Sequence, residues 1–236
     1  MLAPRLQLPV EILPQPDEAT CGPTCLHAVY HYWGRQEPLP EVIARTGKLQ
    51  RGGTVAVFLA CDALRQGFEA TIYTFNLLVF DPSWFVGKVD IAERLLRQCT
   101  QKPGDQRVQE VTPGYVEFLR LGGRLRLTDL SRYLLRGLLR RRLPIITGLS
   151  STYLYRATRE YGPLDQADDI RGAPGGHFVV LTGYDRPARQ VLVADPYGPA
   201  RDYWLKIDRA VGAILLGIVT HDANLLIIHP PRGHRK

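Results

Sequence analysis

One cysteine of the chain, Cys21, stands in a run of residues that can activate a thiol. The run reads Gln15-Pro-Asp-Glu-Ala-Thr-Cys21-Gly-Pro-Thr-Cys25, and a helical pattern begins at Cys21. At a helix start, the aligned peptide dipoles and free N–H groups stabilise a thiolate over a thiol. The side chain of Gln15 can lie beside this helix start, where its amide NH2 would join the Cys21 N–H in holding an oxyanion. The pattern therefore indicates a nucleophile with a pair of oxyanion donors.

A nucleophile of this kind needs a base and a residue that orients the base. The runs GGHFVVLTGY and QVLVAD predict two antiparallel strands around the five-residue loop 185–189. If Tyr184 faces Gln190, the paired positions sum to 374, and His177 falls opposite Tyr197. His177 and Asp195 then share one face as diagonal neighbours, with Cβ atoms about 7–8 Å apart. A one-residue slip would place them on opposite faces, so the proposed pair depends on this register.

The elements that must position these residues divide the chain into two halves. The first half is mostly helical, beginning with a buried helix over 20–33 that Thr20 caps and Gly34 ends. Further helices are expected over 40–45, 54–66, 91–99, 114–121 and 128–141, with one strand over 68–75. The second half predicts short strands over 144–149, 177–184, 190–195, 203–207 and 225–229.

The expected fold class is therefore α+β, in a single domain over residues 1–236. A helical lobe over about 15–142 packs on an antiparallel β-sheet lobe over about 143–229, with a cleft between them. Residues 101–109 are interpreted as a linker, and the tail 230–236 is expected to be disordered.

Composition excludes several classes of protein. The chain has 236 residues, 45% of them hydrophobic, which is enough for a globular core without disulfides or metals. Four cysteines are too few for a disulfide scaffold, and the proline-rich start does not resemble a signal peptide, so we expect a cytoplasmic location. The longest apolar run, 210–219, is about half the length of a membrane span. The net charge of +7 favours acidic partners, but no nucleic-acid-binding signature is present.

The combined pattern resembles a known family. Gln-x5-Cys-Gly-Pro-x-Cys, then Gly-His-Phe-Val-Val-Leu and Asp-Pro, is similar over residues 11–200 to the bacteriocin-processing, double-glycine leader cysteine peptidases of the papain-like superfamily. The resemblance implies that Cys21 is the nucleophile, His177 the general base and acid, Asp195 the residue that orients His177, and Gln15 the oxyanion donor. It also implies a papain-like fold with the catalytic cysteine at the start of a central helix. Those peptidases usually precede an export transporter, which this chain lacks, and its insert over 91–142 is longer than the family pattern leads us to expect.

Simpler interpretations stand beside these roles. Cys21 can be a small buried hydrophobe, which is also our interpretation of Cys25. His177 can be a hydrogen-bonded core histidine, and Asp195 before a proline can start a turn. Because Cys-x3-Cys lacks the spacing of a redox or zinc site, neither is favoured.

Three further features have open interpretations. His27 and His31 have metal-ligand spacing, but with no third ligand we place them on a helix surface. The basic helix around Arg132 to Arg142 is either a solvated face or a site for an acidic partner. Gly175 and Gly176 would give backbone clearance beside the histidine and the cleft.

The function that these residues predict is a cysteine peptidase or amide hydrolase acting on a peptide or protein substrate. It would work through an acyl-enzyme and would require neither a metal nor an organic cofactor. Two alternatives remain: a transpeptidase or amide transferase with the same three residues, and a non-catalytic peptide-binding module. The sequence indicates no oligomeric state.

Overall fold

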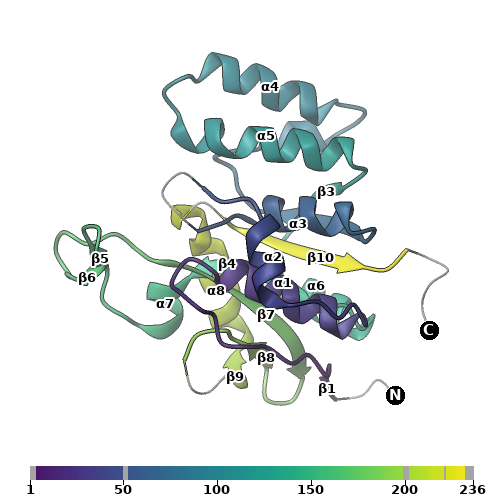
Figure 1. Cartoon of the computed structure of the whole chain (residues 1–236), viewed down its shortest axis with the longest axis vertical. Coiled ribbons are helices and arrows are strands. Elements are labelled where there is room, and N and C mark those ends of the chain that lie inside the picture. The colour runs from purple at the N-terminus through teal and green to yellow at the C-terminus, as the bar shows by residue number, and fades with distance from the viewer. Residues whose placement is uncertain (1–3, 50–52, 199–201, 221, 232–236) are drawn as a thin grey trace.

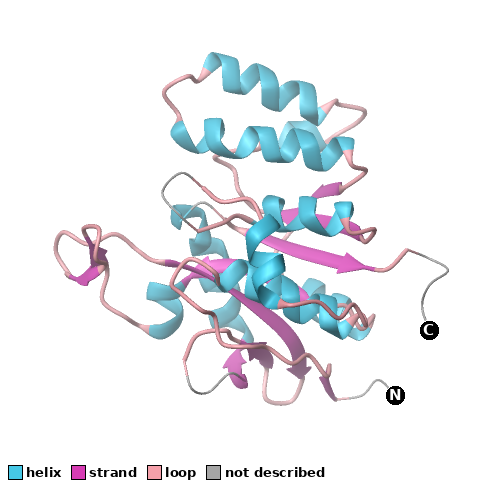
Figure 2. Ribbon diagram, in the orientation of Figure 1, coloured by secondary structure: helices cyan, strands magenta, loops and turns pink. Residues whose placement is uncertain are grey.

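A computed structural model describes residues 4–49, 53–198, 202–220 and 222–231 (Figures 1 and 2). Its α-helices are α1 (Cys21–Tyr32), α2 (Leu39–Arg45), α3 (Ala56–Arg65), α4 (Ile91–Gln101), α5 (Gln106–Arg120), α6 (Arg132–Arg140), α7 (Ser151–Tyr155) and α8 (Ile207–Leu216). Its strands are β1 (Arg5–Gln7), β2 (Glu69–Thr74), β3 (Arg124–Leu127), β4 (Ile145–Ser150), β5 (Glu160–Tyr161), β6 (Gln166–Ala167), β7 (Gly176–Asp185), β8 (Gln190–Ala194), β9 (Asp202–Lys206) and β10 (Asn224–His229). Two 3-10 turns, η1 (Pro82–Phe85) and η2 (Gly217–Thr220), complete the elements.

One sheet organises the molecule. Its strand order is β3-β2-β10-β4-β7-β8-β9, and β1 pairs with β7. Every neighbouring pair is antiparallel except β2 with β3. Strand β10 lies between β2 and β4, so the sheet joins strands from both halves of the chain. The predicted α+β class, with helices packed on a largely antiparallel sheet, is confirmed.

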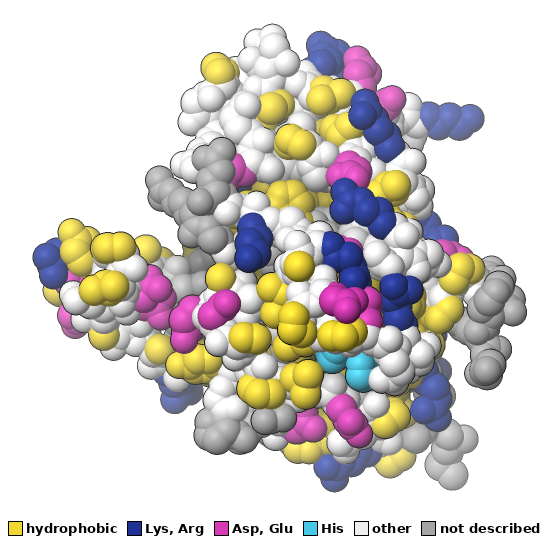
Figure 3. Space-filling view, viewed as in Figure 1, with side chains coloured by type: hydrophobic (Ala, Val, Ile, Leu, Met, Phe, Trp, Pro, Cys, Tyr) yellow, Lys and Arg dark blue, Asp and Glu magenta, His cyan; other side chains and the backbone are white. Residues whose placement is uncertain are grey.

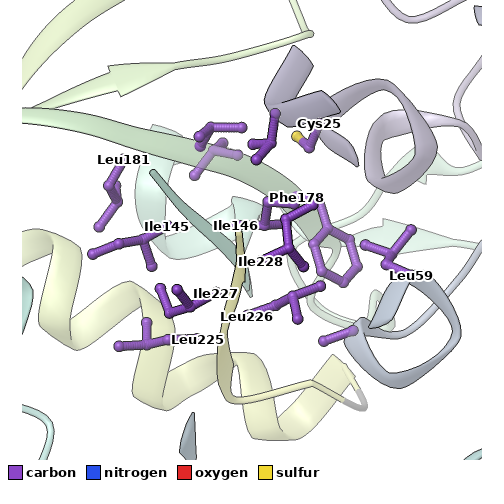
Figure 4. Packing of buried hydrophobic residues seen from close by; sticks show 14 of the residues in the cluster. Cys25, Leu59, Ile145, Ile146, Phe178, Leu181, Leu225, Leu226, Ile227 and Ile228 are labelled. Atoms are coloured by element: carbon purple, nitrogen blue, oxygen red, sulfur yellow. The ribbon is translucent and has the colours of Figure 1, made fainter. Parts of the chain in front are cut away.

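Helices cover both faces of this sheet. The alternation of side chains along β10 shows the two faces, because Leu226 and Ile228 lie toward Leu59 of α3, whereas Leu225 and Ile227 point the opposite way, toward α8 (Figure 4). Both sets are buried, which explains why this strand is a continuous apolar run. Helix α1 is also buried all round from Cys21 to Tyr30, so it is the core helix that the sequence predicts.

The helical hairpin of α4 and α5 corrects one prediction. Helix α5 begins eight residues before the predicted 114, so it includes residues 106–109 of the segment interpreted as a linker. The Asp105 carboxylate accepts a hydrogen bond from the Val108 N–H and caps the new start. Pro113 lies inside this helix, where the sequence rule expected a boundary. Burial of Val108, Val111 and Phe118 outweighs the local preference of proline.

The sequence analysis did not predict strand β3. The helix predicted over 128–141 is shorter in the structure and begins at Arg132. Residues 124–127 alternate Arg-Leu-Arg-Leu and form an edge strand parallel to β2. The two lobes are therefore less separate in sequence than expected: β1, β2 and β3 come from the first half, and α7 and α8 from the second. Of the predicted disordered tail, residues 232–236 lie outside the described residues.

Candidate active site

Cys21 is the first residue of α1 and is buried. The first helical hydrogen bond runs from the Thr24 N–H to the Thr20 carbonyl, so the N–H groups of Cys21 and Gly22 precede the ladder. Thr20 does not cap the helix with its side chain as predicted, because its hydroxyl donates to the Asp17 carbonyl. The helix start therefore presents backbone donors beside the Cys21 sulfur.

Gly22 allows the helix start to lie close to its neighbours. A Cβ atom at this position would collide with the Cγ2 methyl of Thr54 and lie 3.4 Å from the Phe178 ring. Phe178 follows His177 in β7. Because Gly22 has no side chain, the start of α1 can pack against the strand that carries the histidine.

His177 bridges Cys21 and Asp195. Its Nε2 lies 2.8 Å from the Asp195 Oδ1, and its ring is close enough to Cys21 for that side chain to raise the pKa of the histidine. Because Nε2 faces the carboxylate, Nδ1 is the ring nitrogen left to face the sulfur. The structure thus aligns a thiol, an imidazole and a carboxylate from α1, β7 and the end of β8.

A β-bulge sets this alignment. At the loop end of the hairpin, Tyr184 pairs with Val191 and not with Gln190, so the paired positions sum to 375 and the predicted pairing is wrong by one residue. The register then shifts between Leu181 and Gly183, and Leu181 pairs with Val193, which restores the sum of 374. The extra residue in β7 places His177 and Asp195 on the same face, as the sequence prediction required, although for a reason it did not contain.

Two tyrosines that the sequence analysis did not identify hold the carboxylate. The hydroxyls of Tyr155 and Tyr203 donate to the Asp195 Oδ2 at 2.6 and 2.9 Å, and the Tyr197 N–H donates to Oδ1 at 3.0 Å. Tyr155 belongs to the short helix α7 and Tyr203 to β9. In the sequence, Tyr203 was marked only as the first residue of the predicted strand over 203–207, and nothing marked Tyr155.

The electrostatics favour a charged histidine. Burial alone would lower the pKa of His177, but the hydrogen bonds to Asp195 and Cys21, with their negative charges, raise that pKa to about 9. Burial would raise the pKa of Asp195, but the bonds from His177 and Tyr155 lower it below its usual value. Asp195 is thus a carboxylate and His177 an imidazolium at neutral pH.

The other cysteines have different environments. Burial, then the charges of Cys21 and Asp195, raise the pKa of Cys25 well above its usual value, which agrees with its interpretation as a buried hydrophobe. Burial and the charge of Glu117 raise the pKa of Cys61 to about 12. Cys99 is only partly buried and lies in α4, away from this cleft.

Gln15 lies near the other three residues. Its backbone N–H donates to the Pro196 carbonyl at 3.0 Å, which ties the segment before α1 to the residue after Asp195. Its Nε2 donates to the Asp17 carbonyl at 2.9 Å, and its buried Oε1 has no partner among the described residues. One Nε2 hydrogen remains for another acceptor. The role of Gln15 as an oxyanion donor stays a prediction.

A cavity of about 380 Å³ opens beside the cysteine and the histidine. Both side chains line it, together with residues of the segment before α1, of α5, of β4 and of the stretch before β7. Its polar and small lining residues include Glu18, Gly53, Thr54, Gln106, Glu110, Gly148 and Gly176. At Gly175, a Cβ atom would lie 2.7 Å from the Ser151 hydroxyl, so this glycine gives the predicted clearance next to the histidine strand.

The prediction that His27 lies on a helix surface is wrong. His27 is buried and not on a helix surface: its Nε2 bonds to the Glu37 carbonyl, and its ring lies 4.4 Å from that of His31 at a tilt of 37°. Among the described residues, no group of three or more His, Cys, Asp or Glu side chains is arranged to hold a metal ion. In the described chain, no helix is both long and apolar enough to cross a bilayer.

Comparison with known proteins supports the assignment of family and fold. Residues 125–211 match the Peptidase_C39 like family, and this range includes His177 and Asp195. The fold is similar to that of a C39-like peptidase from Bacillus anthracis, with a TM-score of 0.51 at 12% identity over 95% of this chain and 97% of that one. The resemblance to this family that the sequence motifs show is confirmed over residues 125–211, and the fold is similar to that of the C39-like peptidase.

Two further crystal structures are similar at a TM-score of 0.45. One is the peptidase domain of Streptococcus ComA, a bifunctional ABC transporter involved in quorum sensing, with 14% identity over 94% of this chain and 98% of that one. The other is a double-glycine-motif protease from an AMS/PCAT transporter in complex with the leader peptide, with 15% identity over 95% and 94%. No curated protein matches the chain.

Proposed function

We propose that this protein is a cysteine peptidase that cleaves a peptide or protein substrate through Cys21, His177 and Asp195. The observation that carries the proposal is the position of His177, which is hydrogen-bonded to the Asp195 carboxylate and lines the same cavity as the Cys21 thiol. The match of residues 125–211 to a peptidase family supports the same class of reaction.

In the proposed reaction, the Cys21 sulfur attacks the carbonyl carbon of a peptide bond. The negative charge that develops on the carbonyl oxygen is held by the Cys21 N–H at the helix start and by the Gln15 amide. His177 gives its proton to the leaving amine, and the C–N bond breaks to leave a thioester. Water then attacks the thioester carbonyl carbon while His177 takes a proton from it, and the C–S bond breaks, which releases the acid and restores the Cys21 thiolate beside a protonated His177. Asp195 keeps the ring oriented throughout.

Labelling with a thiol-directed papain-type inhibitor tests this proposal. We expect the adduct on Cys21, located by peptide mass spectrometry, because an activated thiol reacts selectively at neutral pH. Cys99 is the internal control, since it is the least buried of the other cysteines. Labelling of Cys99 in preference to Cys21 would contradict the mechanism.

The variant His177→Ala should lose the selective labelling while keeping the folded far-ultraviolet circular dichroism spectrum. Unchanged labelling would remove His177 from its proposed role. Product analysis with an added amine then separates hydrolysis from transfer, because a transferase gives the aminolysis product. A protein whose Cys21 shows no selective labelling would be a non-catalytic binding module.

We propose two further points about its surroundings. Four free thiols agree with a reducing, cytoplasmic compartment.

Arg132 and Arg136 of α6 form a second concavity of about 270 Å³ with Arg186 and Arg189, which supports an acidic partner at this basic helix. Titration with a polyglutamate peptide should show weaker binding in Arg132→Ala/Arg136→Ala than in the unchanged protein; equal binding would exclude this surface.

A further inference from the structure

The charge of the cleft beside Cys21 is opposite to that of the whole protein. The chain carries a net charge of +7, yet among the described residues the ionisable side chains that line this cavity, apart from Cys21 and His177, are the carboxylates Glu18 and Glu110. They come from two distant parts of the chain. Glu18 lies three residues before the nucleophile, and Glu110 lies in α5.

Neither carboxylate has a basic partner in the part of the chain that the structure describes. Within the described ranges, neither Glu18 nor Glu110 forms an ion pair. Glu117, two turns further along α5, does pair with Arg65. The Glu110 Oε1 accepts a hydrogen bond from the Gln106 amide at 3.0 Å, and Gln106 lines the same cavity. Gln106 thus orients Glu110 and leaves its second oxygen free for another donor.

A third carboxylate lies at the base of the β5–β6 hairpin. The Glu160 Oε2 would be 3.1 Å from a Cβ atom at Gly175, next to the strand that carries His177. Burial raises the pKa of Glu160 above its usual value, and the charges of Asp165 and Glu18 raise it further. Glu160 and Glu18 are therefore close enough to repel each other. Figure 3 shows acidic side chains where this hairpin meets the body of the molecule.

We infer that the cleft selects peptides that carry a lysine or arginine side chain close to the scissile bond. This inference rests on the proposed peptidase function, because Cys21 and His177 define the cleft. A cationic side chain bound in this cavity forms ion pairs with Glu18 and Glu110 in a partly enclosed space, where charges attract more strongly than in water. An acidic side chain at the same place is repelled, so the carboxylates also exclude substrates.

Matched covalent probes test the inference without a known substrate. The probes are short peptidyl acyloxymethyl ketones, identical except for lysine, norleucine or glutamate at one of the positions next to the reactive group. We expect the lysine probe to inactivate the protein about tenfold faster than the norleucine probe at one position, and the glutamate probe to be slowest. Added salt should reduce the difference, since it screens the ion pairs.

Charge-removing variants connect this preference to the named residues. Glu18→Gln and Glu110→Gln should each lower the ratio of lysine to norleucine rates several-fold, and the double variant should abolish it. Glu117→Gln is the matched control: it removes a carboxylate from the same helix outside the cavity and should leave the ratio unchanged. Equal rates for lysine and norleucine at every position, or a preference that survives in the double variant, would overturn the inference.

Iodoacetamide, a small neutral reagent, separates the two proposals. If Cys21 is selectively alkylated but shows no preference for lysine probes, only the inferred substrate class fails. If neither iodoacetamide nor any probe labels Cys21 selectively, the proposed function fails, and the inference fails with it.

Discussion

Asp195 illustrates how much support one buried carboxylate receives in this site. It accepts hydrogen bonds from His177, Tyr155, Tyr203 and the Tyr197 N–H, although a single bond is enough to orient an imidazole. A buried charge is costly unless its oxygens are satisfied. The hydroxyls of Tyr155 and Tyr203 satisfy Oδ2, so Oδ1 stays directed at the His177 ring. The two tyrosines therefore act as positioning residues for His177.

We predict that Asp195→Asn moves the titration of His177 to lower pH. In the unchanged protein the pKa is raised to about 9, so the ring is protonated at neutral pH and loses its proton as the pH rises through about 9. Without the carboxylate, the effect of burial, which lowers the pKa, gains weight. Nuclear magnetic resonance of isotopically labelled histidine measures the midpoint. Asp185→Asn, at the other end of β7, is the control, and an unchanged midpoint in Asp195→Asn would contradict the prediction.

At the scale of single elements, the start of α1 depends on a close contact at Gly22. We predict that Gly22→Ala destabilises the protein by about 1–3 kcal/mol, the usual cost of overpacking, and slows labelling of Cys21. This cost outweighs the gain of about 1 kcal/mol in helix propensity from replacing glycine by alanine. Urea unfolding and the labelling rate measure the two effects.

Thr54→Ser provides the rescue for this variant. It removes the methyl group that collides with the new Cβ atom but keeps the hydroxyl that donates to the Gly47 carbonyl at 2.8 Å. The double variant should therefore recover both stability and labelling. If Gly22→Ala alone behaves like the unchanged protein, close packing at the helix start does not position Cys21.

The hairpin of β7 and β8 shows which parts of the site the sequence can predict. Residue types and alternation identify the two strands, because their apolar pattern is local. The pairing is not local: a bulge depends on neighbours such as Leu8, whose N–H bonds to the Thr182 carbonyl at 2.8 Å. The predicted pairing was wrong at the loop and valid beside His177, and only tertiary contacts separate the two cases.

Long-range partners explain the other differences from the sequence prediction. Cys21, His177 and Asp195 stand in recognisable motifs, so their proximity could be anticipated. Tyr155 lies in a short helix with no motif, and Glu110 lies in α5, whose first turn was interpreted as part of a linker. Both reach the site through packing between elements distant in the chain, which periodicity does not report.

At the scale of the whole molecule, Asp222 joins the sheet to a helix next to the cleft. Its carboxylate accepts a hydrogen bond from the Ala56 N–H at the start of α3, and the Asn224 side chain also donates to it. Gly148, which lines the cavity, packs directly on it: a Cβ atom there would lie 3.0 Å from the Asp222 Cβ. Burial raises the pKa of Asp222 to about 7, although both hydrogen bonds oppose the rise.

This shift predicts a pH-dependent contribution to stability. Because the folded-state pKa lies above the usual value of 3.8, the contribution is fully present below about pH 4 and is lost as the pH rises through about 7. Asp222→Asn cannot ionise, so its free energy of unfolding should increase relative to the unchanged protein over this range. The increase should be a few kcal/mol, at about 1.4 kcal/mol for each unit of the pKa difference.

Urea unfolding of both proteins from pH 4 to pH 8 measures the effect. A constant difference between the two would report only the altered hydrogen bonds, since these do not depend on titration of the carboxyl. The predicted signature is a difference that grows with pH, and parallel curves would show that Asp222 does not titrate in this range.

The position of β10 between β2 and β4 has a consequence for biosynthesis. A ribosome-bound chain that has passed the first helix but not the later hairpin holds its sulfur without an imidazole, and its sheet lacks a central strand. Pairings between such distant segments form slowly and only after synthesis of both partners. The proposed site is therefore complete only when translation has delivered the late strands, and an unfinished chain holds Cys21 without its proposed base.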